Sequence, residues 1–478
     1  MSLIQFLRFA RLADALGKVG GWAPERVERL ALGRLRRLVG HAAANSRFFA
    51  RRYAGVELDR LTLADLPPTT KEELRDHFDE AVTDRRVTLE GVSRFTADLA
   101  NLGRWYLGRY AVSHTSGSQG PPLAIVQDRA AVELLFGVMS ARANAGRRAG
   151  PIEGIRRLLD PARVAVVALH RGFYPSAAAM EFMESITKPF TKVARFSATD
   201  PDLVARLNEF QPHSLVGYAS VLEGLALRAD DLRLTSLRQV ANSSEQLTPR
   251  ARHRIERAFA VPVMDHYALG ECLFLSDGCP TDGGAHVNAD WAILENVDAG
   301  GRPVPSGQPG DKVYVTNLAN HVQPFIRYEV RDRVVMTDEP CRCGSRLPRI
   351  LAVEGRSADA LWFADAAGRL RPVPGLLFHD VLDPLHEVRE WRAIQVTPAL
   401  VTLQVETVGG GPAGIDPHVL RERLLAAGAP AEIEVEVEHV GRLAPDSVTG
   451  KFRRIVSHVA PADRGPPTPA RAPAAAGR

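Results

Sequence analysis

The chain has 478 residues, of which 45% are hydrophobic, so it exceeds the length that one hydrophobic core usually serves and two or more domains are expected. Its formal net charge is only +4, and its basic residues are scattered, which argues against a nucleic acid or an anionic membrane surface as the partner. A small-molecule substrate is the better expectation.

The N-terminus and the cysteines indicate where the protein works. Residues 1–15 carry Arg8, Arg11 and Asp14 within an apolar stretch, which is typical of an amphipathic helix and not of a signal peptide. No uninterrupted apolar run approaches the length of a membrane span. The four cysteines are too few for the disulfide framework of a small secreted protein. These features predict a cytoplasmic protein that is not attached to a membrane.

In chain order, the next predicted element after residues 1–15 is also helical. Apolar residues recur at helical spacing over residues 22–54, and Pro67 and Pro68 then mark a loop. Between about residues 110 and 360, short β-rich runs alternate with helical stretches, which indicates an α/β core. The clearest expected strands and helices of this core are residues 164–169, 214–218 and 312–318, and residues 130–146 and 249–259, respectively.

The pattern changes after about residue 355. Strand-like runs at 401–407 and 432–440 surround a helical stretch at 418–427, which indicates a small α+β domain. The last residues, rich in Pro, Ala and Arg, have little to bury and are expected to be disordered. The expected domains are a large α/β domain over 1–355 with a helical N-terminal layer over about 1–75, a small α+β domain over 356–460, and the tail, 461–478.

The first segment that could carry chemistry is a loop rich in glycine and hydroxyl groups at residues 113–122, after a strand-like run. Such a loop can wrap phosphates with backbone N–H groups and hydroxyls, because glycine permits close approach. It is not a Walker loop, since the Gly-Lys-Ser/Thr ending is absent. A flexible surface turn would have the same composition.

Two further segments each place a carboxylate after an apolar run. Glu271 follows a glycine at an expected strand end, where it could hold Mg²⁺ bound to nucleotide phosphates, although a solvated glutamate would give the same pattern. Asp332 ends an alternating run that begins at Phe325. Its carboxylate could accept both hydroxyls of a ribose, or it could simply cap a turn.

Together, and in this order, the three segments resemble the motifs of the adenylate-forming superfamily, which includes acyl-CoA synthetases, luciferases and nonribosomal-peptide adenylation domains. Residues 267–271 are similar to its Tyr-Gly-x-Thr-Glu motif, and residues 328–332 to its Tyr-x-x-Gly-Asp motif. The likeness runs from about residue 35 to 458. Three more segments resemble the phenylacetate–CoA ligase branch in particular: 66–71, 341–344 and 355–359.

The resemblance implies an ATP site with Mg²⁺ held by Glu271. The residues expected to contact ATP are Thr115, Ser116, Gly117, Ser118, Gly120, Ser244, Glu245, Tyr267, Asp332 and Arg356. Lys451 is expected to be the catalytic cation, because negative charge builds up as a carboxylate attacks the α-phosphate. Only six of the 60 basic residues are lysines, so a lysine at this position favours that role over a solvated surface position.

The resemblance also implies a hinge and an acyl pocket. Asp359 falls at the family's hinge, so the small domain is expected to rotate between two half-reactions. The residues expected in the acyl pocket are Phe173, Tyr174, Tyr218, Ala268 and Gly270. Aromatic walls would suit an aromatic or arylacetic acid, although Phe173 and Tyr218 could equally belong to the ordinary core.

The sequence departs from the family motifs in three places. In the phosphate loop, Gln119 and Pro121 stand where threonine and lysine are usual. In the second motif, Ala268 and Gly270 replace glycine and a hydroxyl residue. In the third, residues 329–331 read Glu-Val-Arg before the aspartate. None of these changes removes a carboxylate or lysine with an expected role.

Three of the four cysteines and one histidine form a candidate Zn²⁺ site. Cys341 and Cys343 are two residues apart, and Cys279 with His286 lies upstream at a plausible distance for a second pair of ligands. Members of the phenylacetate–CoA ligase branch can carry a structural zinc. Cys272 could replace His286 as the fourth ligand, and a set of buried free thiols is the alternative.

The expected activity is ATP-dependent conversion of a carboxylic acid to an acyl-adenylate, with release of pyrophosphate, followed by transfer to coenzyme A to give a thioester and AMP. The acceptor could instead be a carrier-protein thiol or an amine, as in biosynthetic members of the branch. A non-catalytic ligand-binding homologue is a third hypothesis. The expected partners are a small carboxylic acid and coenzyme A, and the frequent dimers of the family leave a homodimer open.

Overall fold

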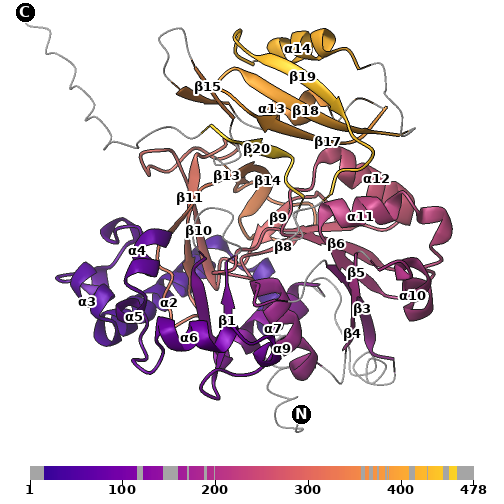
Figure 1. Ribbon diagram of the computed structural model, residues 1–478. Coiled ribbons are helices and arrows are strands. Elements are labelled where there is room, and N and C mark those ends of the chain that lie inside the picture. Colours follow the sequence, from indigo (N-terminus) through magenta and orange to yellow (C-terminus); the bar gives the residue numbers. More distant parts are fainter. Residues whose placement is uncertain are drawn as a thin grey trace, which may run out of the picture. The chain divides into compact units, whose positions relative to one another are not determined.

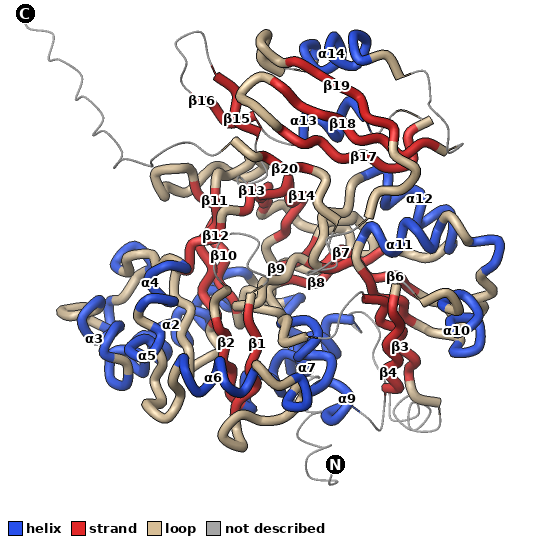
Figure 2. The backbone as a smooth tube through the Cα atoms, in the orientation of Figure 1, coloured by secondary structure: helices blue, strands red, loops and turns tan. Residues whose placement is uncertain are grey.

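The computed structural model forms two compact units, residues 1–358 with 445–452, and residues 359–444 with 453–478. Figures 1 and 2 show the helices and strands of both units. The predicted disordered tail lies outside the residues that the structure describes. The described residues are 15–115, 122–143, 160–168, 172–187, 191–198, 200–356, 361–364, 370–373, 376–382, 385, 387–408, 415–427, 429–444 and 452–459.

The first part of the larger unit is helical, as the spacing of apolar residues predicted. In α2 (Pro24–Asn45), Leu35, Leu38 and Val39 share one face and are fully buried. They pack in a core that includes Phe325, from a segment far along the chain. The helices that follow are α3 (Arg47–Arg52), α4 (Lys71–Asp76), α5 (Phe78–Ala81) and α6 (Leu89–Thr96).

The larger unit contains a five-stranded parallel sheet in the order β4-β3-β5-β6-β7. Helices α10 (Leu203–Phe210), α11 (Ala219–Ala226) and α12 (Pro249–Phe259) pack against it (Figure 1). Because its strands are parallel, their carboxyl ends lie at one edge, where ligands bind in such sheets. The strands are β3 (Ala162–Ala168), β4 (Thr191–Ser197), β5 (Ser214–Gly217), β6 (Gln239–Ser243) and β7 (Val263–His266).

Antiparallel strands complete the larger unit. A hairpin of β1 (Tyr110–His114) and β2 (Ala124–Asp128) brackets the predicted phosphate loop. One further sheet has the order β10-β11-β12, and another has the order β13-β14-β9-β8. Their strands are β8 (Ser276–Gly278), β9 (Ala285–Val287), β10 (Ala292–Val297), β11 (Lys312–Asn317), β12 (Tyr328–Val330), β13 (Asp332–Thr337) and β14 (Arg349–Arg356).

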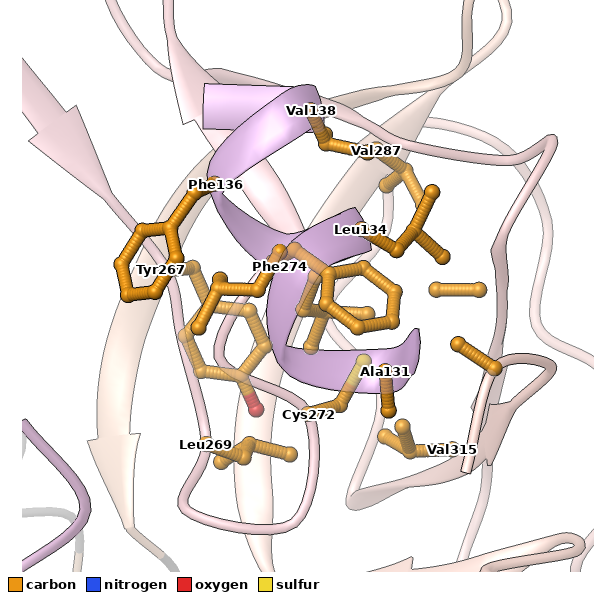
Figure 3. Packing of buried hydrophobic residues seen from close by; sticks show 14 of the residues in the cluster. Ala131, Leu134, Phe136, Val138, Tyr267, Leu269, Cys272, Phe274, Val287 and Val315 are labelled. Carbon is orange, nitrogen blue, oxygen red and sulfur yellow. The ribbon is translucent and has the colours of Figure 1, made fainter. Parts of the chain in front are cut away.

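Helix α7 (Arg129–Ala143) is the centre of the largest core of this unit, and α9 (Pro175–Thr187) packs beside it. Figure 3 shows Leu134 and Phe136 of α7 in one cluster with Tyr267, Leu269 and Cys272, which come from the segment after β7. Apolar burial therefore fixes the Tyr267 segment against a helix that follows the β1–β2 hairpin.

A buried ion pair lies at the end of α7. The Arg142 guanidinium contacts Asp290 Oδ1 at 2.8 Å and donates to Asn288 Oδ1 at 3.0 Å. The side chains of Arg142 and Asp290 are only 6% and 1% exposed. Arg34 of α2 donates to the Asp290 carbonyl and lies 3.4 Å from the ring centroid of Trp291. Burial lowers the pKa of Arg34 to about 10. This network joins α2, α7 and the loop between β9 and β10.

The smaller unit is a four-stranded sheet in the order β19-β18-β17-β20, with two helices and a β15–β16 hairpin. Its core contains Trp391, Phe363 and Phe378, all almost fully buried. Its elements are β15 (Leu361–Ala364), β16 (Leu370–Val373), α13 (Leu376–Leu382), β17 (Val388–Gln395), β18 (Leu400–Thr407), α14 (Pro417–Ala426), β19 (Glu434–His439) and β20 (Ile455–Ser457).

The predicted fold class is confirmed, with a large multi-layer α/β part and a small α+β part. The strands and helices expected from periodicity after residue 22 appear within a few residues of their predicted bounds, with the stretch 22–54 divided between α2 and α3, whereas the helix expected over residues 1–15 lies almost wholly outside the described residues. Across the described ranges, no helix combines the length and the apolar character needed to cross a lipid bilayer.

Asp290→Ala should lower the free energy of unfolding by about 3–5 kcal/mol, because it leaves the buried Arg142 guanidinium without its carboxylate. Chemical denaturation measures the loss. Asp298→Ala is the matched control, since the Asp298–Arg302 pair is largely exposed on its arginine side and should contribute at most about 1 kcal/mol. Equal losses in the two variants would contradict a structural role for the buried pair.

Candidate active site

Three predicted site residues follow three neighbouring parallel strands. Tyr218 follows β5, Ser244 follows β6 and Tyr267 follows β7. Since β5, β6 and β7 are adjacent and parallel, these residues lie at the same edge of the sheet. The topology therefore gathers residues that are about 25 positions apart in the sequence.

Tyr267 and Asp332 meet directly. The Tyr267 hydroxyl donates a hydrogen bond to Asp332 Oδ2 at 2.9 Å, and the two residues are 9% and 4% exposed. Tyr267 follows the parallel strand β7, whereas Asp332 begins the antiparallel strand β13. The phenol thus orients a buried carboxylate at the junction of two sheets, where it can accept hydrogen bonds from a diol.

Glu271 lies in a tight reversal just after Tyr267. The backbone groups of Leu269 and Cys272 bond each other across this reversal, at 2.9 and 3.3 Å. Glu271 is only 6% exposed, so it is not the solvated glutamate that the sequence alone left open. Its carbonyl accepts a hydrogen bond from Asn317 Nδ2 at 2.8 Å. A buried carboxylate near the carboxyl edge of a parallel sheet is a suitable ligand for a hard divalent cation.

Gly270 has no room for a side chain. A Cβ atom built on it would lie 2.7 Å from Pro175 Cγ and 3.0 Å from Ile125 Cδ1. Pro175 begins α9, directly after the predicted pocket residue Tyr174, and Ile125 belongs to β2. This close packing is the physical reason for one departure from the family motif, since a hydroxyl residue at this position would collide with the proline ring.

A second departure from the motifs also has a structural partner. Glu329 of β12 accepts a hydrogen bond from Lys312 Nζ at 2.8 Å, and both side chains are less than one-fifth exposed. Arg331 lies 3.8 Å from the same carboxylate. The Glu-Val-Arg sequence before Asp332 therefore forms a local ion-pair network that ties β12 to β11.

Thr115 closes the base of the predicted phosphate loop. Its backbone N–H donates to the Leu123 carbonyl at 3.0 Å, and its side-chain oxygen accepts from the Leu123 N–H at 2.9 Å. Ser116, Gly117, Ser118 and Gly120 lie outside the described residues, together with Gln119 and Pro121. The described hairpin holds both ends of this loop close together.

The predicted adenine-contacting turn has a strained backbone. Ser244 has φ of +73°, a conformation that costs a non-glycine residue about 1–2 kcal/mol. Asn242, which is fully buried, donates from Nδ2 to the Glu245 carbonyl at 2.8 Å and to Asp265 Oδ1 at 2.7 Å. Glu245 Oε2 in turn accepts from the Ser220 N–H at 2.9 Å, at the start of α11. These bonds hold the turn in place.

The expected acyl pocket is brought together only in part. Tyr174 is half-buried, and its ring lies 5.3 Å from that of His114 at the end of β1. Phe173 is 3% exposed and packs edge-on against Phe95 of α6, so its ring belongs to the core, the alternative that the sequence left open. Tyr218 precedes α11, and Ala268 lies beside Gly270 in the reversal after β7.

Three predicted residues are only partly placed, or not placed at all, by the described structure. Arg356 pairs with Asp332 in the β13–β14 ladder, but its side chain is outside the described residues. Asp359 and Lys451 are also outside the described residues. Their hinge and catalytic roles stay predictions.

Cys279, His286, Cys341 and Cys343 form one cluster. Their ligand atoms all lie within 4.8 Å of one another. Cys279 Sγ and Cys341 Sγ are 3.5 Å apart, and Cys343 Sγ is 3.3 Å from His286 Nε2. Thiolates bound to one tetrahedral Zn²⁺ lie about 3.8 Å apart, so these separations fit such an ion. Among the described residues, Cys272 is not part of the cluster.

The surroundings of the cluster affect its four side chains differently. His286 Nδ1 lies 3.4 Å from the Leu347 carbonyl, the kind of contact that orients a ligating imidazole. Burial raises the pKa of the Cys341 thiol to about 12. Burial also opposes ionisation of Cys279, but hydrogen bonds from backbone N–H groups, including that of Asp282, outweigh it and lower the pKa of this thiol.

Cys272 has a different environment. It is fully buried in the apolar core around α7, next to Leu269 and Phe274 (Figure 3). Burial raises the pKa of its thiol, which therefore stays protonated. This cysteine packs as a small apolar residue, and its place in the core separates it from the other three.

Sequence reasoning missed a group of buried amides beside the site. Asn317, Asn320 and Gln323 are at most 1% exposed and bond to backbone groups of other segments. No motif marks them, because their partners are main-chain atoms more than 40 residues away. Asn242 was missed for a similar reason, since its partner Asp265 is on the neighbouring strand.

The chain resembles known proteins in sequence and in fold. No model of a known protein family matches the chain. The chain is 26% identical over 352 residues to a phenylacetate–coenzyme A ligase of Thermus thermophilus, and the alignment covers 70% of the chain and 72% of that relative. It is 28% identical over 164 residues to protein CapK of Staphylococcus aureus, which covers 33% of the chain and 34% of CapK.

Solved structures extend the likeness to the whole fold. A 2-hydroxyisobutyryl-CoA ligase in its postadenylation state, in complex with R3-HIB-AMP, superimposes with a TM-score of 0.69 at 20% identity, and the match covers 92% of this chain and 91% of that one. The same enzyme with 2-HIB-AMP and CoA in the thioesterification state gives a TM-score of 0.57 at 21% identity over the same shares of the two chains.

The chain is thus similar in sequence to a phenylacetate–coenzyme A ligase and shares the fold of acyl-CoA ligases. A benzoate CoA ligase from Burkholderia xenovorans LB400 shares the fold at a TM-score of 0.50 and 18% identity, over 72% of this chain and 67% of that one. The described segments that resemble the superfamily motifs thus lie on a fold of the kind that the resemblance implies.

Gly270→Ser, which restores a hydroxyl residue usual in the superfamily, should lower the free energy of unfolding by about 1–3 kcal/mol, because the new side chain collides with Pro175. It should also weaken binding of ATP with Mg²⁺, since Glu271 is the next residue. Denaturation and calorimetric titration measure the two effects. Gly33→Ser in α2 is the control, because a Cβ there meets nothing within 4 Å. Unchanged stability and affinity in Gly270→Ser would show that the packing tolerates a side chain.

Proposed function

We propose that the protein is an AMP-forming acid–CoA ligase. It would convert a carboxylic acid and ATP to an acyl-adenylate and pyrophosphate, and then transfer the acyl group to coenzyme A with release of AMP. The observation that supports this function most is the buried hydrogen bond between Tyr267 and Asp332, two motif residues that are brought together beside Glu271. The phenylacetate–coenzyme A ligase relative favours the same activity.

Each proposed role follows from charge and position. Asp332 would accept the ribose hydroxyls, and the turn at Ser244 with Tyr267 would flank the adenine. The phosphate loop, whose base Thr115 closes, would hold the ATP phosphates. Glu271 would hold Mg²⁺, which would offset the charge of those phosphates. Lys451 would supply a cation at the α-phosphate as the carboxylate attacks.

The substrate proposal is an aromatic or arylacetic acid with coenzyme A as acceptor. Tyr174 beside His114 offers an aromatic wall at the end of β1, next to the phosphate-loop hairpin. The Thermus relative is named for phenylacetate, and the solved 2-hydroxyisobutyryl-CoA ligase was captured with CoA. Both observations favour coenzyme A as the thiol.

ATP–pyrophosphate exchange against aryl, arylacetic and short aliphatic acids tests the adenylation step. The wild-type protein should exchange with one acid class, and Lys451→Ala should lose about 10²–10³-fold, the usual cost of removing one charge-stabilising group. Thioester formation from a supplied acyl-adenylate should survive in Lys451→Ala, because no pyrophosphate leaves in that step. Equal loss of both half-reactions would contradict the role of Lys451, and silence of the wild type with every acid would contradict the function.

We further propose that Cys279, His286, Cys341 and Cys343 bind a structural Zn²⁺. The donor set is one that zinc favours, and its separations fit a tetrahedral ion. The ligands come from the β8–β9 region and from the loop between β13 and β14, so the ion would fasten that loop to the sheet. With four protein ligands and no open position, its role would be structural.

Purified protein should contain about one zinc per chain, and Cys341→Ser should reduce the content severalfold and lower the thermal midpoint, because metal binding contributes directly to folding. Elemental analysis and thermal unfolding measure both. Cys272→Ala is the matched control, since it removes a buried thiol outside the cluster and should keep the metal. Equal metal content in the two variants, or none in the wild type, would contradict the zinc site.

A further inference from the structure

A set of buried side-chain amides lies near the β1–β2 hairpin, and two of them contact β2. Asn317 ends β11, and Asn320 and Gln323 follow it in the loop that leads to β12. All three residues are at most 1% exposed. Buried amides are costly unless they are hydrogen-bonded, so their partners indicate what they are for.

Gln323 completes the free edge of β2. Its Oε1 accepts a hydrogen bond from the Val126 N–H at 2.8 Å, and its Nε2 donates to the Ala124 carbonyl at 2.9 Å. Asn320 Nδ2 donates to the Val126 carbonyl at 2.9 Å. The other edge of β2 pairs with β1. Two side chains thus take the place of a neighbouring strand, in a hairpin that would otherwise bury unpaired backbone groups.

Asn317 connects the same loop to the Glu271 reversal. Its Nδ2 donates to the Glu271 carbonyl at 2.8 Å. Its Oδ1 accepts from the backbone N–H groups of Ala319 and Asn320, at 3.0 and 3.2 Å, which fixes the start of the loop. One short segment therefore holds β2, which leads out of the phosphate loop, and the backbone of the proposed Mg²⁺ ligand.

We propose that Asn320 and Gln323 are positioning residues for the phosphate loop, and that Asn317 sets the distance between this loop and Glu271. The inference rests on the proposed function, because it takes the loop to hold ATP phosphates and Glu271 to hold Mg²⁺. None of the three amides needs to touch the nucleotide. They act through backbone atoms of β2 and of Glu271, and a small displacement of either element would misalign the phosphates and the cation.

The two half-reactions should respond differently to loss of these amides. The phosphate loop would act on groups that leave as pyrophosphate, so its position matters for adenylation and not for transfer of the acyl group from a preformed adenylate. A residue that only stabilises the fold would affect both half-reactions to the same extent. The ratio of the two activities is therefore the informative quantity.

Gln323→Leu is the test variant, because leucine keeps the bulk and removes both bonds to β2. The apparent KM for ATP in pyrophosphate exchange should rise about tenfold, while the rate of thioester formation from supplied acyl-adenylate should stay within about twofold. Gln239→Leu is the matched control: Gln239 lies at the amino end of β6, its amide donates to Ser214 Oγ at 2.7 Å, and its loss should leave both values unchanged. Equal changes in KM for the two variants, or parallel loss of both half-reactions in Gln323→Leu, would overturn the proposal.

Amide hydrogen exchange tests the position of β2 without depending on enzyme activity. Amide exchange across residues 110–128 should accelerate at least about tenfold in Gln323→Leu and stay unchanged in Gln239→Leu, because only the former frees Val126 N–H. Unchanged exchange in Gln323→Leu would overturn the inference, whereas a wild-type protein inactive with every acid would overturn the proposed function alone. If the leucine variant does not fold, Gln323→Glu carries the same tests, since it keeps the acceptor for Val126 and loses the donor to Ala124.

Discussion

The hydrogen bond between Tyr267 and Asp332 joins the parallel sheet of the larger unit to the antiparallel sheet that contains β13, at the place where the proposed nucleotide site forms. Tyr267 extends from a parallel strand and Asp332 begins an antiparallel one, so neither sheet alone could present both groups. The bond is buried, which makes it stronger than a solvent-exposed one and makes its loss more costly. Glu271 lies four residues after Tyr267, and Ser244 lies in the turn that follows the adjacent strand β6.

Polar groups buried around this junction define its shape. Asn242 stabilises the turn at Ser244, whose positive φ is unfavourable for a serine. Asn317 donates a hydrogen bond to the backbone carbonyl of Glu271. Buried amides of this kind add little net stability, but each fixes the position of its partner because an unpaired alternative is expensive. Close packing also restricts the position of the backbone at Gly270, because Pro175 leaves no room for a side chain. The positions of the residues around Tyr267 and Asp332 therefore depend on contacts between different strands and loops.

The sequence predicted those features that depend on residues close to one another along the chain. Local patterns predicted α2, α12 and the strands β3, β5 and β11, because burial of one helical face or of a whole strand imposes a repeat. Order and spacing of the motifs led to Tyr267, Glu271 and Asp332, and cysteine spacing led to a cluster that the structure brings together. The choice between His286 and Cys272 needed the fold, since only the tertiary structure buries Cys272 in the α7 core.

The features that sequence reasoning could not reach depend on tertiary contacts. Phe173 packs against Phe95, and nothing in its local sequence distinguishes a core phenylalanine from a pocket wall. The amides of Asn317 and Gln323 bond main-chain atoms of distant segments, which carry no side-chain signature at all. Glu329 departs from the family motif, and its ion pair with Lys312 on the adjacent strand is visible only in the structure.

The central claim is that the acid is activated as an acyl-adenylate, and oxygen transfer from the acid tests it most directly. The protein would be incubated with ATP, coenzyme A and an arylacetic acid labelled with ¹⁸O in its carboxyl group, and the nucleotide products would be analysed by mass spectrometry. Attack of the carboxylate on the α-phosphate predicts that one labelled oxygen appears in AMP, with unlabelled pyrophosphate. Formation of ADP with the label in orthophosphate would mean that the acid attacks the γ-phosphate, and it would contradict the account.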